Sequence, residues 1–201
     1  MPASDVIKTS LERNWGMVDR AVDNLDDAML SRLIDGQVNS IAWLLWHMTR
    51  VVDVFTQTRL RGIPQLWVQD GWVEKCGLSD DPETTGQGWS PEQVAAWKAP
   101  TKAVLLGYFE ATKAEARKYL DGLSNADLDT TRIVPPATEP RSVSEMLGIL
   151  LYDNIVHGGQ IAFLRGYFEG RGWFAPLPPA VGGSSAGSVH PFPRFLKHLQ
   201  R

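Results

Sequence analysis

The sequence predicts an all-α protein built as a four-helix bundle. Apolar residues recur at the 3.6-residue spacing of a helix in four long segments, and polar stretches rich in Gly, Pro and Asp separate them. No stretch alternates apolar and polar residues over the length of a half-buried strand, and no repeat of solenoid period is present. Long helices with one apolar stripe each bury those stripes by packing against one another, which favours a bundle.

The first half of the chain contains two of these helices. Residues 4–25 form the first, with Ser4 as the candidate N-cap, and residues 26–34 add a short helical turn. The second helix begins after a cap at Asn39 and ends at about Arg61, shortly before a Gly and a Pro. The stripes that predict these two helices are Ile7, Leu11, Trp15, Val18, Val22 and Leu25, then Ile41, Leu44, Leu45, Met48, Val51, Val52 and Phe55.

The second half contains the other two helices. Ser90-Pro91-Glu92-Gln93 places a capping Ser before a Pro at the first helical position and a Gln at the third, which predicts a helix start. Pro100 interrupts the pattern, so we expect a short helix, a break, and then a long helix up to Gly122. Ser142-Val143-Ser144-Glu145 is a capping box, and it opens the last helix, which ends at about Glu169.

The connections differ in character. Residues 62–90 contain three Trp residues without clear periodicity, and we expect a long connection there, with or without a helical turn inside it, of a kind that is often functional. Residues 121–140 form a polar connection. Residues 170–193 are rich in Gly and Pro and predict an extended tail, while residues 192–201 suggest a short basic helix.

Size and charge narrow the classes of function. The 201 residues, 43% of them hydrophobic, suit one domain, which we place at residues 1–170, with residues 171–201 as a tail packed on it. Twenty Lys and Arg residues against 23 Asp and Glu give a net charge of −3, so we expect no nucleic-acid partner. The longest strongly apolar run, residues 41–46, is too short to cross a bilayer, and the N-terminus lacks a signal-peptide pattern. We therefore expect a cytoplasmic protein without a membrane partner.

Two ionisable residues interrupt the apolar stripe of the last helix. Asp153 and His157 lie one turn apart on the face that also carries Met, Leu, Ile and Phe. An Asp and a His at this spacing point toward one spot, as helical metal ligands do, although a hydrogen-bonded pair filling a hole in the core is equally consistent. His47 lies at the edge of the second helix's stripe, where it is either a packing residue or a third ligand. Two His and one carboxylate would leave a position open, as in catalytic rather than structural metal sites.

Several neighbouring residues are candidates for supporting roles. Gly158 and Gly159 permit close approach of a helix or of a ligand, and Gln160 is placed to orient a metal ligand or to lie at the surface. We expect Trp43, Trp67, Trp72 and Gly158 to line an apolar pocket for a small-molecule substrate. Cys76 lacks any pattern typical of a nucleophile, and it excludes an intramolecular disulfide because it is the only Cys. The sequence also lacks the paired Glu-x-x-His motifs of di-iron bundles and the common nucleotide, metalloprotease and hydrolase motifs.

Ala42-Trp43-Leu44-Leu45-Trp46-His47, together with Asp153-x3-His157-Gly158-Gly159-Gln160-Ile161, resembles the DinB/YfiT-like superfamily over residues 4–170. The resemblance implies an up-down-down-up bundle, often homodimeric, that binds a divalent metal through a His on the second helix and a His-x3-His pair on the last. Those positions fall on His47, Asp153 and His157. Asp153 departs from the commonest pattern, and a carboxylate there is similar to the Glu-x3-His of the metal-binding domain of mycothiol-dependent maleylpyruvate isomerase.

The resemblance implies a thiol-dependent S-transferase or isomerase that uses Zn²⁺ or Ni²⁺ and a low-molecular-weight thiol such as mycothiol or bacillithiol. Two other functions fit the same residues. One is a non-catalytic bundle that binds a small molecule or dimerises, with Asp153 and His157 as a buried polar pair. The other is metal-assisted hydrolysis with the same ligands.

Overall fold

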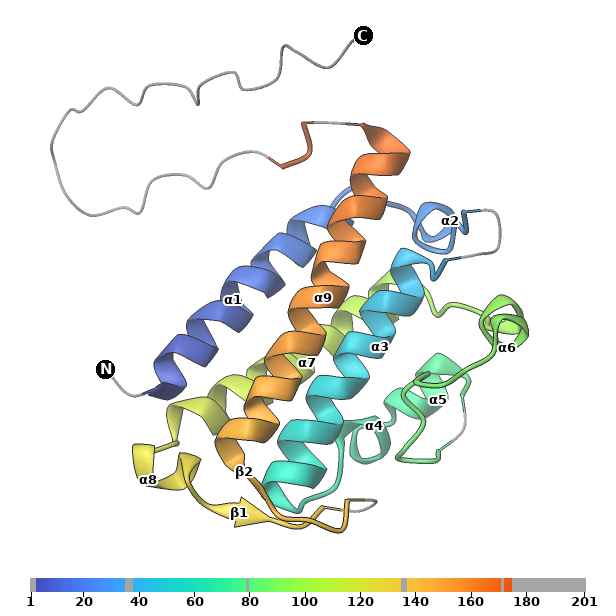
Figure 1. Ribbon diagram of the computed structural model, residues 1–201. Helices are drawn as coiled ribbons and strands as arrows, with labels where there is room; N and C mark the ends of the chain where they lie inside the picture. Colours follow the sequence, from blue (N-terminus) through green and yellow to red (C-terminus); the bar gives the residue numbers. More distant parts are fainter. Residues whose placement is uncertain (1–2, 35–37, 79, 135–136, 171, 175–201) are drawn as a thin grey trace, which may run out of the picture.

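Four long helices form a bundle in the computed structural model (Figure 1), which describes residues 3–34, 38–78, 80–134, 137–170 and 172–174. They are α1 (Ala3–Val22), α3 (Ile41–Asp53), α7 (Lys102–Asp121) and α9 (Val143–Glu169). A π-helical segment, η1 (Val54–Arg59), continues α3 directly. Figure 1 shows α1 and α9 running in one direction and α3 and α7 in the other, so the predicted all-α, up-down-down-up bundle is confirmed.

Each long helix packs on two others. Helix α9 packs against α1 and α3, and α7 packs against the same two from the opposite side. Helices α3 and α7 can run parallel because a long connection joins them, as parallel neighbours require. That connection contains α4 (Leu66–Gln69), α5 (Trp72–Cys76) and α6 (Pro91–Ala96). The long connection predicted over residues 62–90 contains two short helices where the sequence allowed for one helical turn, and the chain leaves helical structure around Pro100, as predicted.

The remaining short elements join the ends of the long helices. Helices α2 (Asp27–Leu30) and α8 (Asn125–Leu128) follow α1 and α7. Strands β1 (Thr131–Arg132) and β2 (Arg141–Ser142) pair antiparallel in the connection expected only to be polar. Two residues per strand are too few to give an alternating pattern, which is why the sequence did not indicate them.

Ser side chains cap the starts of four helices, α3, α6, α8 and α9. The capping boxes of Ser90 and Ser142 form as predicted, each with the side chain of the third helical residue bonded back to the cap. The cap of α3 is Ser40 rather than the expected Asn39, because the Ser40 hydroxyl is the group that accepts the Trp43 N–H. Ser4 is not a cap either, since α1 begins at Ala3 and Ser4 is buried within it.

Helix α3 is the centre of the core, and every one of its residues is buried. The apolar stripe of α1 predicted from the sequence faces it across the bundle, with Leu11, Trp15 and Val18 fully buried. Burial of a polar side chain is costly unless it finds a partner. Three ionisable residues of α3, His47, Arg50 and Asp53, are buried, so their partners determine what this helix can do.

No helix in the described ranges combines the length and the apolar composition that crossing a bilayer requires. The tail predicted at residues 171–201 and the short basic helix predicted at residues 192–201 lie outside the described residues, apart from residues 172–174. The division into residues 1–170 and a tail packed on them stays a prediction.

Candidate metal site

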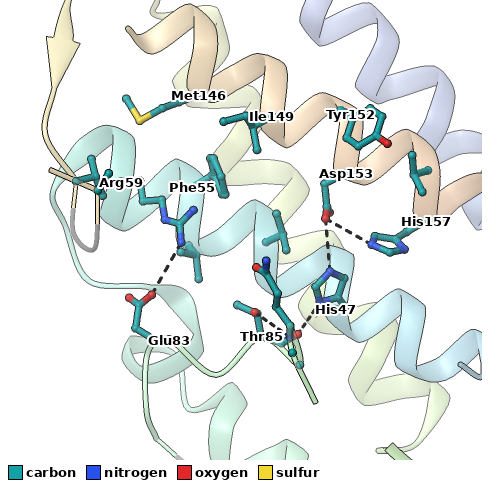
Figure 2. Close-up of a pocket in the computed structure, with 18 of the residues that line it drawn as sticks. His47, Phe55, Arg59, Glu83, Thr85, Met146, Ile149, Tyr152, Asp153 and His157 are labelled. Atoms are coloured by element: carbon teal, nitrogen blue, oxygen red, sulfur yellow. Dashed lines mark hydrogen bonds and ion pairs between the residues drawn. The ribbon is translucent and has the colours of Figure 1, made fainter. Parts of the chain in front are cut away.

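His47, Asp153 and His157 meet between α3 and α9. The Nε2 atoms of His47 and His157 each lie 3.5 Å from the same oxygen of Asp153, Oδ1. The two imidazole rings approach edge to face, with centroids 4.7 Å apart. Each of the three residues offers one ligand atom, and these atoms lie within 4.8 Å of one another. Figure 2 shows the three side chains converging from the two helices.

The connection after α5 fixes the His47 ring. The backbone carbonyl of Thr85 lies 2.6 Å from Nδ1 of His47, and since a carbonyl oxygen only accepts, Nδ1 carries the proton (Figure 2). Nε2 of His47 therefore faces Asp153, where it can donate to the carboxylate when it carries a proton or offer its lone pair to a cation when it does not. A hydrogen bond of this kind on the second ring nitrogen is what orients metal-binding histidines in proteins.

The same segment stays against α3 because Arg50 binds its backbone. Nε of Arg50 donates to the Thr84 carbonyl at 3.0 Å and Nη2 donates to the Pro82 carbonyl at 2.8 Å. Gly86, at φ +86°, continues the close approach, since a Cβ there would lie 2.7 Å from the Trp43 ring. Trp43 in turn stacks on His47, with centroids 5.0 Å apart and planes 9° from parallel. The His47 ring is thus held from two sides.

Gln160 holds the second imidazole. Its Oε1 lies 2.7 Å from Nδ1 of His157, one turn earlier on α9. Both histidines therefore have Nδ1 bonded to an amide oxygen and Nε2 directed at Asp153. The sequence left Gln160 as either an orienting residue or a surface amide, and the structure shows an exposed side chain that contacts the His157 ring.

The electrostatics of His47, Asp153 and His157, referred to below as the trio, favour binding of a cation. Burial raises the pKa of Asp153, but hydrogen bonds from His157 and His47 outweigh it and hold that pKa below its ordinary value. Burial alone would lower the pKa of His157, yet Asp153 and Gln160 raise it. Oδ2 of Asp153 is buried and has no partner among the described residues. Two imidazole nitrogens and one ionised carboxylate, one of whose oxygens has no partner among the described residues, are a ligand set that fits a divalent metal ion.

A cavity of about 1010 Å³ opens beside the trio, and all three residues line it. Trp43 and Trp89 form part of its wall near His47, and Phe55 and Ile149 provide apolar surface farther along. Its volume is at the upper end of the range for small-molecule sites. Because the cavity reaches the three residues directly, a ligand in it could approach a metal held there.

The tryptophans of this cavity are only partly those that the sequence suggested. Trp43 lines it, but Trp67 and Trp72 do not. Trp67 is fully buried between the Arg50 guanidinium, 4.5 Å from its ring, and Tyr108. Trp72 stacks on the Tyr108 ring, with the two ring centroids 5.4 Å apart. Trp89, which is preceded by two glycines with positive φ, is the tryptophan of residues 62–90 that lines the cavity.

Gly158 serves helix packing and does not line the cavity. A Cβ at Gly158 would lie 2.1 Å from Oδ1 of Asn14, so the missing side chain lets α1 approach α9. The Asn14 amide donates to the Asn154 carbonyl at 2.8 Å, and Trp15 Nε1 donates to the Asn154 side chain at 3.1 Å. This contact was missed because the centre of α9's buried face passes through Asn154 and Gly158, with Asp153 and His157 at its edge.

Cys76 takes no part in the site. Its thiol is buried, and burial raises its pKa to about 11, so it is protonated at neutral pH. Burial explains why it behaves as the ordinary thiol that the sequence indicated. A thiolate nucleophile in this protein would have to come from a bound molecule.

Comparisons with known proteins agree with this architecture. The family model of the DinB superfamily matches residues 10–161, more than half of the chain. The fold is similar to the crystal structure of a conserved protein from Enterococcus faecalis, with a TM-score of 0.74 and 24% sequence identity over 85% of this chain and 99% of the other. At that identity the likeness shows the fold alone. No protein with a curated description matches significantly. Because the family model matches the chain from within α1 to within α9 and includes His47, Asp153 and His157, the chain belongs to the DinB superfamily.

Proposed function

We propose that this protein is a divalent-metal-dependent enzyme of the thiol-dependent S-transferase or isomerase kind, with His47, Asp153 and His157 holding Zn²⁺ or Ni²⁺. One observation supports the metal site. The Nε2 atoms of His47 and His157 both lie 3.5 Å from Asp153 Oδ1 at the cavity wall, while their Nδ1 atoms are hydrogen-bonded to amide oxygens. The thiol, of the mycothiol or bacillithiol kind, enters from the resemblance to thiol-dependent relatives. When bound, the metal would favour the thiolate of that co-substrate at neutral pH.

The residues of the chain would supply the rest of the chemistry. Thr85 and Gln160 keep Nδ1 of the two histidines protonated and their Nε2 atoms available. Trp43 and Trp89 exclude water from one side of the cavity beside His47. Buried, protonated Cys76 cannot replace an external thiol. These features support a pocket in which a small electrophile and a thiol meet next to the trio.

The first experiment is elemental analysis of protein purified without chelator or immobilised-metal resin. We expect near-stoichiometric Zn or Ni in the wild type and in Asp80→Ala, an exposed carboxylate used as the matched control, and none in Asp153→Ala. Wild-type protein that stays metal-free after incubation with Zn²⁺ and Ni²⁺ would contradict the proposal. It would favour a non-catalytic bundle that binds a small molecule.

The second experiment assays the metal-loaded protein with mycothiol, bacillithiol or glutathione and an electrophile such as monochlorobimane. Thiol conjugation lost in His157→Ala would support the S-transferase. Ester hydrolysis without any thiol, lost in the same variant, would instead assign metal-assisted hydrolysis to these ligands.

A homodimer is part of the proposal. Helix α9 is apolar on nearly all sides, yet only part of it is covered by the bundle, and such a helix favours burial on every face. Its exposed apolar residues are Ile149, Tyr152, Ile155, Val156, Phe163 and Tyr167. A second copy meeting this face with the same face would cover them in both chains. Sedimentation equilibrium should show a dimer that Phe163→Lys dissociates and that Ile133→Lys, an exposed residue next to β1, leaves intact.

A further inference from the structure

Three arginines lie along the part of the cavity away from the trio. Arg59 comes from η1, Arg132 from β1 and Arg141 from β2, and all three line the cavity. Figure 2 shows Arg59 at one end of the drawn residues and His47, Asp153 and His157 at the other, with Phe55 and Ile149 between them. Twelve positions separate His47 from Arg59 along α3 and η1, a rise of roughly 18 Å at helical geometry. The cavity is therefore long, with cationic groups far from the candidate metal site.

The fold places these three positively charged side chains where they repel one another. Arg132 and Arg141 are directly opposite each other in the strand pair, a placement that is unfavourable for like charges. Arg141 also repels Arg59: burial lowers the pKa of Arg59, Glu83 opposes this, and Arg141 lowers it further. Repulsion of this kind is relieved when an anion binds among the guanidinium groups.

The acidic groups nearby offset only part of the charge of the three arginines, through Glu83 beside Arg59 and through Glu145 near Arg141. Hydrogen bonds from Ser142 and, to a smaller extent, the charge of Arg141 lower the pKa of Glu145. Glu83 contacts Arg59 at 3.9 Å, a marginal distance, and its side chain is 59% exposed. Glu139 also lines the cavity, but among the described carboxylates none forms an ion pair with Arg132 or Arg141. Arg59, with its guanidinium 4.4 Å from the Phe55 ring, is held at the boundary between the charged end and the apolar middle.

We infer that the cavity binds an elongated organic anion, with an apolar body and a carboxylate or phosphate group held by Arg59, Arg132 and Arg141. Guanidinium groups bind both oxyanions through paired hydrogen bonds. The apolar body would lie along Phe55, Met146 and Ile149, which places the opposite end of the molecule beside His47, Asp153 and His157. The role of that end as the reacting end rests on the proposed function, whereas binding of the anion does not require a metal.

The test is isothermal titration calorimetry with four eight-carbon probes: octanoate, octyl phosphate, 1-octanol and octylamine. We expect octanoate, octyl phosphate or both to bind, and the comparison between them identifies the preferred oxyanion. Arg132→Gln/Arg141→Gln should weaken that binding about tenfold or more, since it removes two charged donors. The control Lys98→Gln/Lys118→Gln removes the same charge from residues outside this cavity and should leave the affinity nearly unchanged.

Glu83→Gln tests the same inference in the opposite direction. Removing the carboxylate that shares Arg59 should tighten anion binding severalfold, a result that loss of folding cannot imitate. Equal affinity for octanol and octanoate, preference for octylamine, or unchanged binding in a folded Arg132→Gln/Arg141→Gln protein would overturn the inference. Each titration is run with chelator and with Zn²⁺. Anion binding without any metal binding would refute the proposed function alone, and metal binding without anion binding would refute this inference alone.

Discussion

His47 and Arg50 lie one turn apart on α3, yet the polar clusters built on them differ in completeness. Around Arg50, Asp53 and Tyr108, the charged groups have partners on every side. Asp53 accepts hydrogen bonds from the Leu66 and Trp67 backbone N–H groups at 3.0 and 2.8 Å and from the Tyr108 hydroxyl at 2.6 Å. Arg50 donates to Tyr108, Gln65 and two backbone carbonyls. Around His47, Asp153 Oδ2 has no partner in the described part of the chain, and a cavity reaches the cluster.

Completeness of the hydrogen bonding distinguishes structural from functional polar residues within this one helix. A buried charge with a full set of partners stabilises one arrangement of the chain, here the attachment of the connection between α3 and α7 to α3. A partly buried cluster beside a cavity, with a possible ligand atom that has no partner, can still bind a ligand. The predictions below test this contrast by breaking each cluster in turn.

The largest effect is expected in the cluster of Arg50, Asp53 and Tyr108, which we call the closed cluster. Asp53→Ala leaves Arg50 buried without its carboxylate and frees two backbone N–H groups, so the free energy of unfolding should fall by about 3–5 kcal/mol. Urea unfolding followed by tryptophan fluorescence measures it. Asp70→Ala, an exposed carboxylate, is the control and should change stability by less than about 0.5 kcal/mol. An Asp53→Ala protein as stable as the wild type would show that the closed cluster does not hold the fold.

We call His47, Asp153 and His157 the open cluster. Its contribution to the free energy of unfolding should depend on bound metal more than on mutation of Asp153. In chelator, Asp153→Ala should unfold within about 1 kcal/mol of the wild type, because Asp153 is partly exposed and only one of its oxygens is engaged. Metal at a hundredfold excess over its Kd should stabilise the wild type by about 2.7 kcal/mol and the variant not at all. Equal stabilisation of both proteins by metal would place the ion elsewhere and erase the contrast between the clusters.

A smaller effect is expected from the residue that orients His157. Gln160→Ala removes the acceptor 2.7 Å from Nδ1 without removing a ligand atom, so metal affinity should fall roughly 10–100-fold. Competition with a fluorescent chelator measures the affinity. Gln69→Ala, at an exposed position of α4, should leave it unchanged. Full affinity in Gln160→Ala would mean that the imidazole needs no support in this site.

How much of this could be predicted depends on whether a feature lies within one helix. The helices follow from periodicity and capping residues, and Asp153 with His157 follows from the spacing of one turn. The sequence left His47 as either a packing residue or a third ligand, and the resemblance favoured the ligand, since helix periodicity does not say which edges of two helices meet. The closed cluster and the three arginines were not anticipated, because their members come from α3, η1, α7, the long connection and the strand pair.

The tryptophans and Gly158 show the same limit at single residues. Trp67, Trp72 and Trp89 share one connection, and only its path in space decides that Trp89 reaches the cavity. Gly158 lies next to His157 in sequence, but a rotation of 100° per residue turns it toward Asn14 on α1 instead. A rotation of one residue about the axis of α9 therefore separates a residue that packs on α1 from a residue that lines the cavity.

The smallest expected effect is the pH dependence of metal binding at the open cluster. Metal binding displaces the proton of His157, whose pKa the hydrogen bonds to Asp153 and Gln160 raise against the opposing effect of burial. Affinity should therefore be constant above that raised pKa and fall by about tenfold per pH unit below it, as the proton competes for Nε2. Chelator competition between pH 8 and 5.5 measures the affinity, and NMR titration of the imidazole in metal-free protein measures the pKa. Because the raised pKa brings protonation closer to neutrality, the decline should begin at a higher pH than for an unperturbed histidine. Constant affinity across the range would show that His157 is not a ligand.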